Sequence, residues 1–518
     1  MAPSLLRHGS ILSILTLVSR ILGLFREMTK AALLGTTALS DAFSVAFMIP
    51  NLFRRLFAEG SISVAFIPTF KEYLQHNDEE SIFEFLSCFF TVLIVLVSFV
   101  VAAGIIFTPE LVSFFKMGAF DETVLLTRFM FPFLALVSLA SLFQGILNSV
   151  YVFAPSGFAP IILNVVTIVC AYLLSRWTEN PARAMAIGIV AGGALEALVQ
   201  LPFVVKKGFY FSFTGLKRAF CNLGVKKVLR LIVPTIIGMA AYQLNDLVST
   251  ALAGNVGAGV VSSLQYSLRL QELILGVFAV SIGTVLLPRF AEHAQSGDWE
   301  SYNRQLLSSV QTIILITVPI TFFAVANGDA LIRLLFQSRT FNEESVSLTV
   351  NAFNFHILGL LFIALNRILA PAFYAQSDSR SPTLAGIISF VVNMILAVIL
   401  SGPFRGGGIA AALSLASAVN TVFLFLFLKR NSKIHVGDII RTALFYTGKI
   451  ALFSGIALIP VLLCRGLFFQ FAESGRIVRY GLPLLITTIL YAIIGLFLLF
   501  VTKDLQVRSL VSLFRKKT

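Results

Sequence analysis

The chain has 518 residues, of which 57% are hydrophobic and only 12% charged, about half the charged fraction of an ordinary soluble domain. This composition argues against a soluble globular protein. The net charge is +14, from 39 Lys and Arg against 25 Asp and Glu. In a membrane protein such an excess collects in cytoplasmic loops, so we expect no nucleic-acid partner. The four cysteines stand singly, without a CxxC pair, and indicate neither a disulfide framework nor a metal site.

Long stretches of high hydropathy, interrupted by charges and by proline and glycine turns, predict about fourteen membrane-spanning helices. They lie near residues 10–33, 40–67, 83–107, 124–150, 157–176, 184–205, 229–252, 262–287, 306–327, 350–375, 382–401, 407–428, 441–464 and 480–502. The first of them contains Arg20 and Arg26 and lacks a cleavage site of small residues, so we expect a retained helix rather than a signal peptide. The expected fold class is an all-α integral membrane protein.

The loops predict the orientation in the membrane. Segment 206–230 carries seven basic residues and no acidic one, and the positive-inside rule places it in the cytoplasm. The basic segments 429–433 and 503–518 then fall on the same side, the latter as a short amphipathic tail at the membrane surface, and segment 110–122 falls opposite. Both termini are therefore expected in the cytoplasm.

A weak internal repeat predicts two lobes. FAEGSISVAFIPTF (57–70) aligns without gaps with VFAVSIGTVLLPRF (277–290) at an offset of 220 residues. Six predicted helices separate the two copies, which makes the repeat parallel. We expect an N-lobe over 1–205, a basic cytoplasmic linker over 206–230, a C-lobe over 231–428, two additional helices over 429–502 and the tail 503–518. Chance similarity between apolar segments is the alternative.

Ionisable residues inside spans are unevenly distributed. Each costs about 2.5–3.5 kcal/mol on insertion scales, so they usually face a cavity or one another. They concentrate in the first, second and eighth spans, as Arg20, Arg26, Glu27, Asp41, Arg54, Arg55, Glu59, Arg269 and Glu272. Five arginines against four acids predict a cationic cavity and an anionic ligand, and the planar guanidinium suits the oxygens of a diphosphate. Structural ion pairs or snorkelling arginines are the alternative.

Spacing predicts how these charges pair. Arg55 and Glu59 stand four residues apart and Arg269 and Glu272 three apart, so each pair can meet on one helix face. We expect such acids to orient an arginine rather than perform chemistry. The chain contains no GxSxG and no HExxH motif, and no predicted loop is large enough for a soluble catalytic domain, which argues against an enzyme.

Three further polar groups lie in predicted spans. Asp246, Asn393 and Glu196 are weaker candidates for binding a cation or proton, with helix–helix hydrogen bonding as the alternative. His356, alone on an apolar face, is expected to be a packing residue. The glycines 406–408 follow no strand and carry no GK[ST], so they are expected to begin a helix.

Several motifs resemble one known family. SRILGLFRE (19–27), SDAF (40–43), PNLFRRLFAEGSISVAFIP (50–68), LPRF (287–290) and LAPAFYAQSDSRSP (369–382) closely resemble the MurJ (MviN) family of the multidrug, oligosaccharidyl-lipid and polysaccharide exporter superfamily. The resemblance covers essentially the whole chain. It implies a transporter in peptidoglycan and cell-wall biogenesis that flips lipid II, the undecaprenyl-diphosphate-linked precursor, across the bacterial inner membrane.

The resemblance also implies residue roles. The family's cavity arginines and their acids match Arg20, Arg26, Asp41, Arg54, Arg55, Glu59, Arg269 and Glu272, and Glu27 stands where the family often has aspartate. We expect the five arginines to bind the substrate, and we expect four acids to act as gate or arginine-orienting residues, namely Glu27, Asp41, Glu59 and Glu272. Some members have a sodium site, for which Asp246 and Asn393 are the candidates here, although Ala397 offers no ligand one turn later.

The expected mechanism is alternating access of two lobes around a cationic cavity, with the lipid tail along a groove formed by 429–502. The expected partners are lipid II, the phospholipid bilayer and other proteins of cell-wall synthesis, with no cofactor and with coupling to Na⁺ or to the membrane potential left open. One alternative is a cation-coupled exporter of small molecules from the same superfamily, which would need an acidic cavity. Another is a membrane transferase acting on a polyprenyl phosphate.

Overall fold

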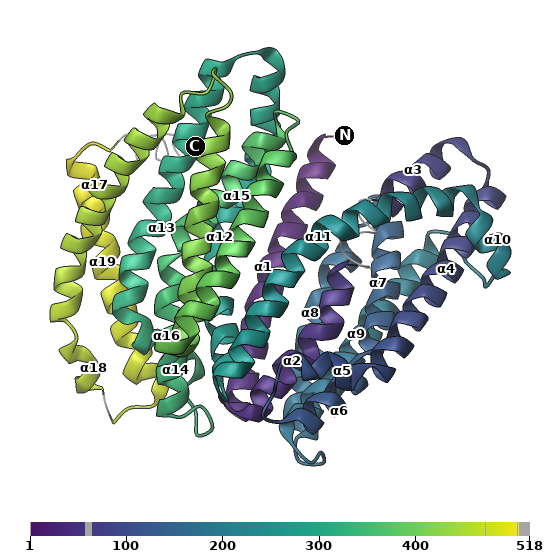
Figure 1. Ribbon diagram of the computed structural model, residues 1–518, viewed down its shortest axis with the longest axis horizontal. Helices are drawn as coiled ribbons and strands as arrows, with labels where there is room; N and C mark the ends of the chain where they lie inside the picture. The colour runs from purple at the N-terminus through teal and green to yellow at the C-terminus, as the bar shows by residue number, and fades with distance from the viewer. Residues whose placement is uncertain (1, 57–64, 472, 505, 507–518) are drawn as a thin grey trace. The chain divides into compact units, whose positions relative to one another are not determined.

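The computed structural model describes residues 2–56, 65–471, 473–504 and 506, and within them every regular element is a helix (Figure 1). The elements are α1 (Ala2–Leu34), α2 (Ala38–Arg54), α3 (Ile67–His76), α4 (Glu79–Ile106), α5 (Thr108–Ser113), α6 (Phe120–Met130), α7 (Pro132–Ser149), α8 (Ala154–Leu174), α9 (Pro181–Lys206), α10 (Leu216–Cys221), α11 (Leu223–Val256), α12 (Val260–Ser296), α13 (Trp299–Phe336), α14 (Glu343–Leu358), α15 (Leu360–Tyr374), α16 (Arg380–Leu428), α17 (Val436–Leu463), α18 (Gly466–Gln470), the π-helix η3 (Ile477–Gly481) and α19 (Leu482–Val501). The all-α prediction is confirmed.

The spans predicted from hydropathy fall on these helices. Among the described residues, eight helices are long and apolar enough to cross a membrane, or nine if α14 and α15, bent by 43° relative to each other, form one span. The first, seventh and eighth predicted spans fall on α1, α11 and α12. The second, 40–67, begins on α2, and its residues 57–64 lie outside the described residues. Three of these four helices, α1, α2 and α12, carry the intramembrane arginines. The sequence therefore located the helices well, including those whose charges weaken the apolar signal.

α16 covers two predicted spans. Its 49 residues would extend about 70 Å as one straight helix, more than twice the roughly 30 Å of a bilayer core. The helix is broken at Arg405, whose backbone angles are φ 50° and ψ −130°. A Cβ on Gly408 would lie 2.0 Å from the Leu400 carbonyl oxygen, so only glycine permits this close approach after the break. The glycines after Arg405 therefore begin the second half of α16, as the sequence predicts.

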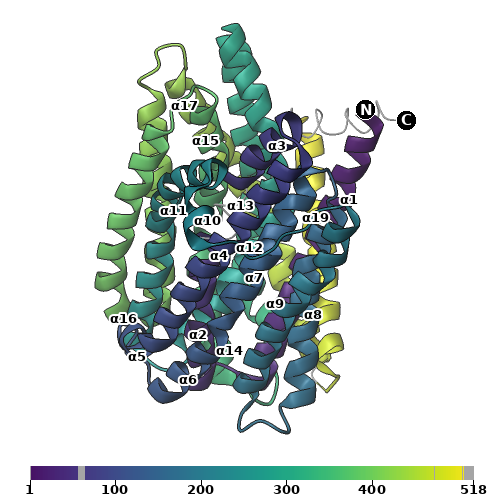
Figure 2. The ribbon, with the colours of Figure 1, turned by 90° about the vertical axis from the view of Figure 1, so that its right-hand side faces the viewer.

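Contacts divide the chain into two compact units, Met1–Ser262 and Ser263–Thr518. In the first unit α9 packs against α7 and α8, α1 against α8, and α2 against α6, and Figure 2 shows α4, α7, α8 and α9 running through this unit. This grouping places α11 in the first unit. The predicted lobes, 1–205 and 231–428, rest on sequence equivalence rather than on contacts, and they stay a prediction.

In the second unit the helices near the C-terminus are largely exposed. α13 packs against α14, α15 and α17, α16 packs against α14 and α15, and α17 packs against α19. Only 22% of the apolar window of α17 or α19 is buried, compared with 72% for the span formed by α6 and α7. Large apolar side chains on these helices and at their ends, such as Phe445, Leu463 and Phe500, are about four-fifths exposed. Such exposure suits helices that face lipid.

The basic segment 206–230, predicted as a linker, is packed onto the first unit. The backbone N–H groups of Ser212 and Thr214 donate to the side-chain hydroxyls of Ser87 and Thr91 on α4, each over 3.0 Å. Because these bonds satisfy extended backbone that has no partner strand, they hold the segment along α4. The segment is thus part of the first unit rather than a free connection.

Ion pairs continue this attachment. Arg218 Nε donates to Glu84 Oε1 over 2.8 Å. Lys227 pairs with Glu72 and lowers the pKa of that carboxyl below the ordinary value of a glutamate.

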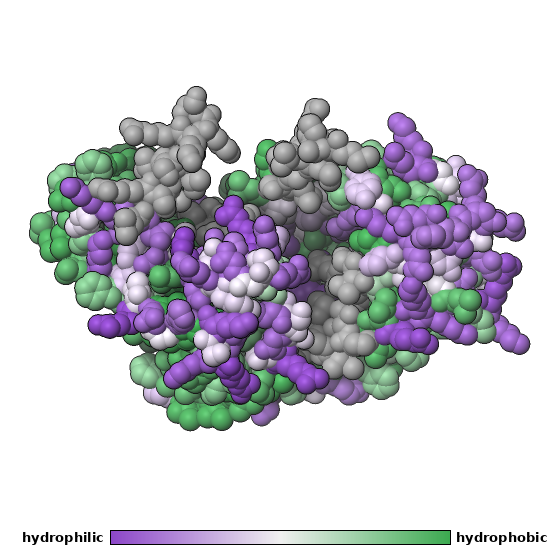
Figure 3. Space-filling view, turned by 90° about the horizontal axis from the view of Figure 1, so that it is seen from above, coloured by the Kyte–Doolittle hydropathy of each residue, from purple (hydrophilic) through white to green (hydrophobic). Residues whose placement is uncertain are grey.

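The two ends of the first unit differ in the elements that they carry. Figures 1 and 2 place α3 and α10 at one end and α5 and α6 at the other, and Figure 3 shows hydrophilic residues gathered over the end with α3 and α10. Segments 206–230 and 110–122 therefore lie at opposite ends, as the predicted orientation requires.

Thr91→Val is expected to loosen this attachment. Valine keeps the shape but removes the hydroxyl that accepts from Thr214, a loss of about 1 kcal/mol. Trypsin should then cut the 206–217 segment faster in the variant. Thr127→Val is the matched control, since the Thr127 hydroxyl donates to the Thr123 carbonyl within its own helix. Equal cleavage rates in the two variants would contradict the proposed attachment.

Candidate functional site

Three charged side chains near the end of α1 form one cluster. Arg26 Nη2 lies 3.1 Å from Glu27 Oε1, and Lys30 Nζ lies 3.4 Å from Glu27 Oε2. The side chains of Arg26 and Glu27 are 15% and 14% exposed, and that of Lys30 is 3% exposed. Because one carboxylate is shared by two cations, the cluster carries a net charge of +1.

α2 supports this cluster from the side. Lys30 Nζ donates to Ser44 Oγ over 2.9 Å, and the Ser44 hydroxyl donates to the Ser40 carbonyl over 2.7 Å. The Arg26 guanidinium lies 5.4 Å from the centre of the Phe47 ring, within cation–π range. Lys30 was not among the residues selected from the sequence. Its spacing of three residues from Glu27 was the signal that could have identified it.

Asp41 on α2 binds the backbone before and within the first turn of α12. Its two carboxylate oxygens accept from the N–H groups of Gly259, over 2.6 Å, and Ser262, over 2.7 Å, and its side chain is almost fully buried. Gly259 has φ +82°, and a Cβ there would lie 2.3 Å from the Thr36 carbonyl oxygen, so this turn requires glycine. Asp41 thus caps a helix end, a task that the sequence did not reveal. Its role as a gate or arginine-orienting acid stays a prediction.

The tandem arginines at the end of α2 have different partners. Arg54 Nε donates to Asn51 Oδ1 over 2.8 Å on its own helix. Arg55 Nη1 donates to Gln243 Oε1 on α11 over 3.4 Å. Glu59, the predicted partner of Arg55, lies outside the described residues, so that pairing stays a prediction.

The charges of α1 and α2 are strongly unbalanced. Between positions 20 and 55 the chain carries five basic residues and two acidic ones, Arg20, Arg26, Lys30, Arg54 and Arg55 against Glu27 and Asp41. Arg20 is partly exposed on α1. This excess, all within the first unit, is the electrostatic environment that attracts an anion.

In the second unit, α12 carries the predicted pair Arg269 and Glu272. Arg269 Nη1 lies 3.5 Å from Glu272 Oε2, which confirms that pairing. Elsewhere on α12, Ser267 Oγ lies 2.6 Å from Nδ1 of the buried His356, and the Gln271 amide donates to the His356 carbonyl. His356 is therefore a hydrogen-bonded packing residue, as the sequence predicts.

Comparison with known proteins identifies the family. A model of the lipid II flippase MurJ family matches residues 30–473. A relative from Treponema pallidum (strain Nichols), named probable lipid II flippase MurJ, is 46% identical over 510 residues, which is 97% of this chain and 96% of the relative. The chain belongs to the MurJ family.

Other MurJ proteins and solved structures agree. A lipid II flippase MurJ from Burkholderia cenocepacia is 32% identical over 423 residues, covering 80% of this chain and 82% of the relative. A structure described as lipid II flippase MurJ in an inward closed conformation matches with a TM-score of 0.78 at 24% identity, covering 95% of this chain and 99% of that one. A structure described as an inward-facing conformation of a multidrug resistance MATE family transporter of the MOP superfamily matches with a TM-score of 0.68 at 12% identity, covering 82% of this chain and 99% of that one. These matches confirm a multi-pass transporter fold, and the family is one of transporters rather than enzymes.

The sodium site expected from the family resemblance stays a prediction. Asp246 lies exposed on α11 in the first unit, whereas Asn393 lies buried on α16 in the second. Ala397 is buried beside Asn393 on α16, one turn later. In the part of the chain that the structure describes, no three His, Cys, Asp or Glu side chains come together as a metal site.

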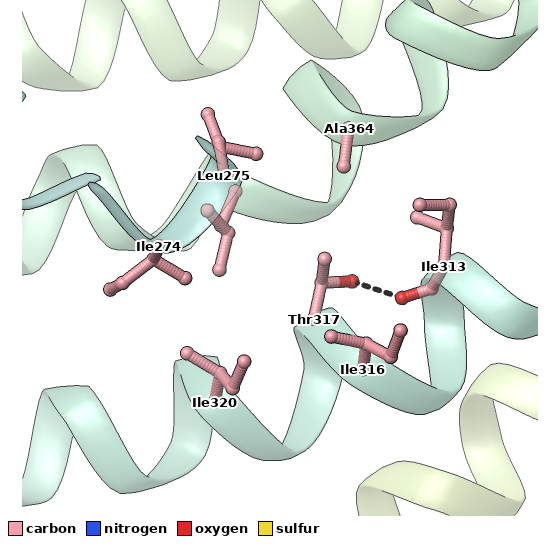
Figure 4. Close-up of a pocket in the computed structure, with 8 residues that line it drawn as sticks. Ile274, Leu275, Ile313, Ile316, Thr317, Ile320 and Ala364 are labelled. Atoms are coloured by element: carbon pink, nitrogen blue, oxygen red, sulfur yellow. Dashed lines mark hydrogen bonds between the residues drawn. The ribbon is translucent and has the colours of Figure 1, made fainter. Parts of the chain in front are cut away.

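A small pocket in the second unit is apolar (Figure 4). It is lined by Ile274, Leu275, Ile313, Ile316, Thr317, Ile320, Leu360 and Ala364. The Thr317 hydroxyl, the one polar side-chain group among these residues, donates to the Ile313 carbonyl over 2.8 Å. The pocket thus suits hydrocarbon, and it offers an anionic headgroup no charged partner.

Proposed function

We propose that this protein flips lipid II from the cytoplasmic to the outer leaflet of the bacterial inner membrane. Membership of the lipid II flippase MurJ family and the 46% identity to a probable lipid II flippase support this proposal. The structural observation that carries it is the excess of basic side chains on α1 and α2. A diphosphate is the anionic part of the lipid II headgroup, and arginine contacts its oxygens in pairs.

The proposed mechanism is alternating access around a cationic cavity lined by the five arginines 20, 26, 54, 55 and 269. Like charges held together repel, and this repulsion favours an open state when no anion is bound. A bound diphosphate offsets the repulsion and lets the protein close around the headgroup. Release on the other side of the membrane restores the repulsion. The acids Glu27, Asp41, Glu59 and Glu272 would orient the arginines or act in gating.

We further propose that the polyprenyl tail stays in the bilayer, alongside α17 and α19. The low burial of these two helices and their exposed Leu444, Leu463 and Phe497 side chains support this part of the proposal.

The same proposal includes the two lobes predicted from the repeat and the cytoplasmic position of both termini. It also includes coupling to Na⁺ or to the membrane potential. A rival exporter of cationic drugs would need an acidic binding site, whereas the clusters on α1 and α2 are basic.

Depletion of the protein in its own cells tests the proposal. An enzyme that attacks lipid II only from the outer face would report how much precursor has crossed the membrane. We expect outer-face lipid II to fall about tenfold or more while total precursor accumulates inside, because the headgroup cannot cross the hydrocarbon core unaided.

Re-expression of the wild-type chain is the control and should restore outer-face lipid II. Unchanged accessibility after depletion, in cells without a second flippase, would contradict the proposed function and favour a different cargo.

A further inference from the structure

Lys30 is a buried cation on a helix that otherwise presents arginines. The residue is 2% exposed, and a charged amine at such a site is stable only with close partners. Those partners are the Glu27 carboxylate, 3.4 Å away on α1, and the Ser44 hydroxyl, 2.9 Å away on α2. The arrangement is specific, because it joins two helices through one ammonium group.

Glu27 divides its carboxylate between two cations. Oε1 faces Arg26 and Oε2 faces Lys30. If Lys30 were neutral, Glu27 and Arg26 would form a pair with no net charge, and the carboxylate would repel an approaching diphosphate. With Lys30 in place the cluster keeps a charge of +1, and the ammonium group fixes the position of the carboxylate beside Arg26.

We propose that Lys30 is a positioning residue for headgroup binding, which acts through Glu27 to keep Arg26 available to the diphosphate. This inference rests on the proposed function. It assigns a role to a residue that need not contact the substrate, and it predicts that the affinity for lipid II follows the net charge of the three side chains.

Binding of fluorescently labelled lipid II to the purified full-length protein in lipid nanodiscs tests the inference. Lys30→Met keeps the size of the side chain and lowers the cluster charge to zero, so we expect about tenfold weaker binding. The double variant Glu27→Gln/Lys30→Met returns the charge to +1, so it should recover most of the affinity that Lys30→Met loses.

The control is Thr29→Val, a neighbouring buried site on α1 whose hydroxyl donates to the Phe25 carbonyl of the same helix. It should bind like the wild type. If Lys30→Met does not fold, the comparison of Glu27→Gln with the double variant replaces it, and the double variant should bind about tenfold more weakly than Glu27→Gln.

The outcomes separate the two proposals. Equal binding by Lys30→Met and wild type would overturn the inference, and so would weak binding by the double variant, which would mean that Lys30 only maintains the fold. Wild-type protein that does not bind lipid II would overturn the proposed function and the inference with it. Rescue by the second substitution is the result that a merely structural lysine does not produce.

Discussion

Arg26→Ala is expected to abolish delivery of lipid II to the outer leaflet while the protein still accumulates in the membrane. The substitution removes a guanidinium of the basic cluster on α1, and the charges of the remaining Glu27 and Lys30 side chains sum to zero. Arg269→Ala, on α12, should have the same effect, because it removes the other unit's proposed contact to the headgroup. We expect at least a tenfold loss of outer-face lipid II in each variant, measured in cells that lack the wild-type chain.

Arg176→Ala is the matched control for these two variants. Arg176 is exposed between α8 and α9 and is not among the predicted cavity residues, so its removal should leave transport unchanged. Membrane levels of all three variants would be compared by immunoblot. Full transport by both Arg26→Ala and Arg269→Ala would contradict the proposed role of the arginines.

Asp41→Ala is expected to destabilise the fold strongly. The substitution leaves the N–H groups of Gly259 and Ser262 buried without their acceptor, at a cost of roughly 1–3 kcal/mol for each. The Tm of the purified protein in detergent, followed by intrinsic fluorescence, should fall clearly. Asp41→Asn keeps one acceptor oxygen and should give an intermediate Tm.

Asp78→Ala provides the comparison at an exposed helix cap. Asp78 accepts from the Ser81 N–H over 3.0 Å at the start of α4, where water can replace the lost acceptor. Its Tm should therefore fall less than that of Asp41→Ala. Equal Tm values for the two alanine variants would show that burial of the Asp41 bonds contributes nothing to stability.

Local features of the chain were predictable because they depend on spacing along one helix. Hydropathy located the helices, and the glycines after Arg405 were correctly expected to begin one. The pairing of Arg269 with Glu272 followed from a separation of three residues, which places both on one helix face. The excess of arginine over acid likewise required only counting within predicted spans.

Contacts between distant segments were not predictable from spacing. Hydropathy alone did not reveal that segment 206–230 would attach to α4, since its bonds join Ser212 and Thr214 to hydroxyls more than a hundred residues away. Lys30 was not singled out from the sequence, because its hydrogen bond to Ser44 depends on how α2 packs beside α1.

The sequence by itself determined that this protein is a helical membrane protein with an excess of arginines in its first two helices, because hydropathy and charge are properties of the residues themselves. Only the tertiary structure decided that Asp41 caps the start of α12, because that task depends on which buried N–H groups the folded chain brings to its carboxylate. Burial removes water from these charged and polar groups, so each of them depends on the hydrogen-bonding partners that the fold brings to it.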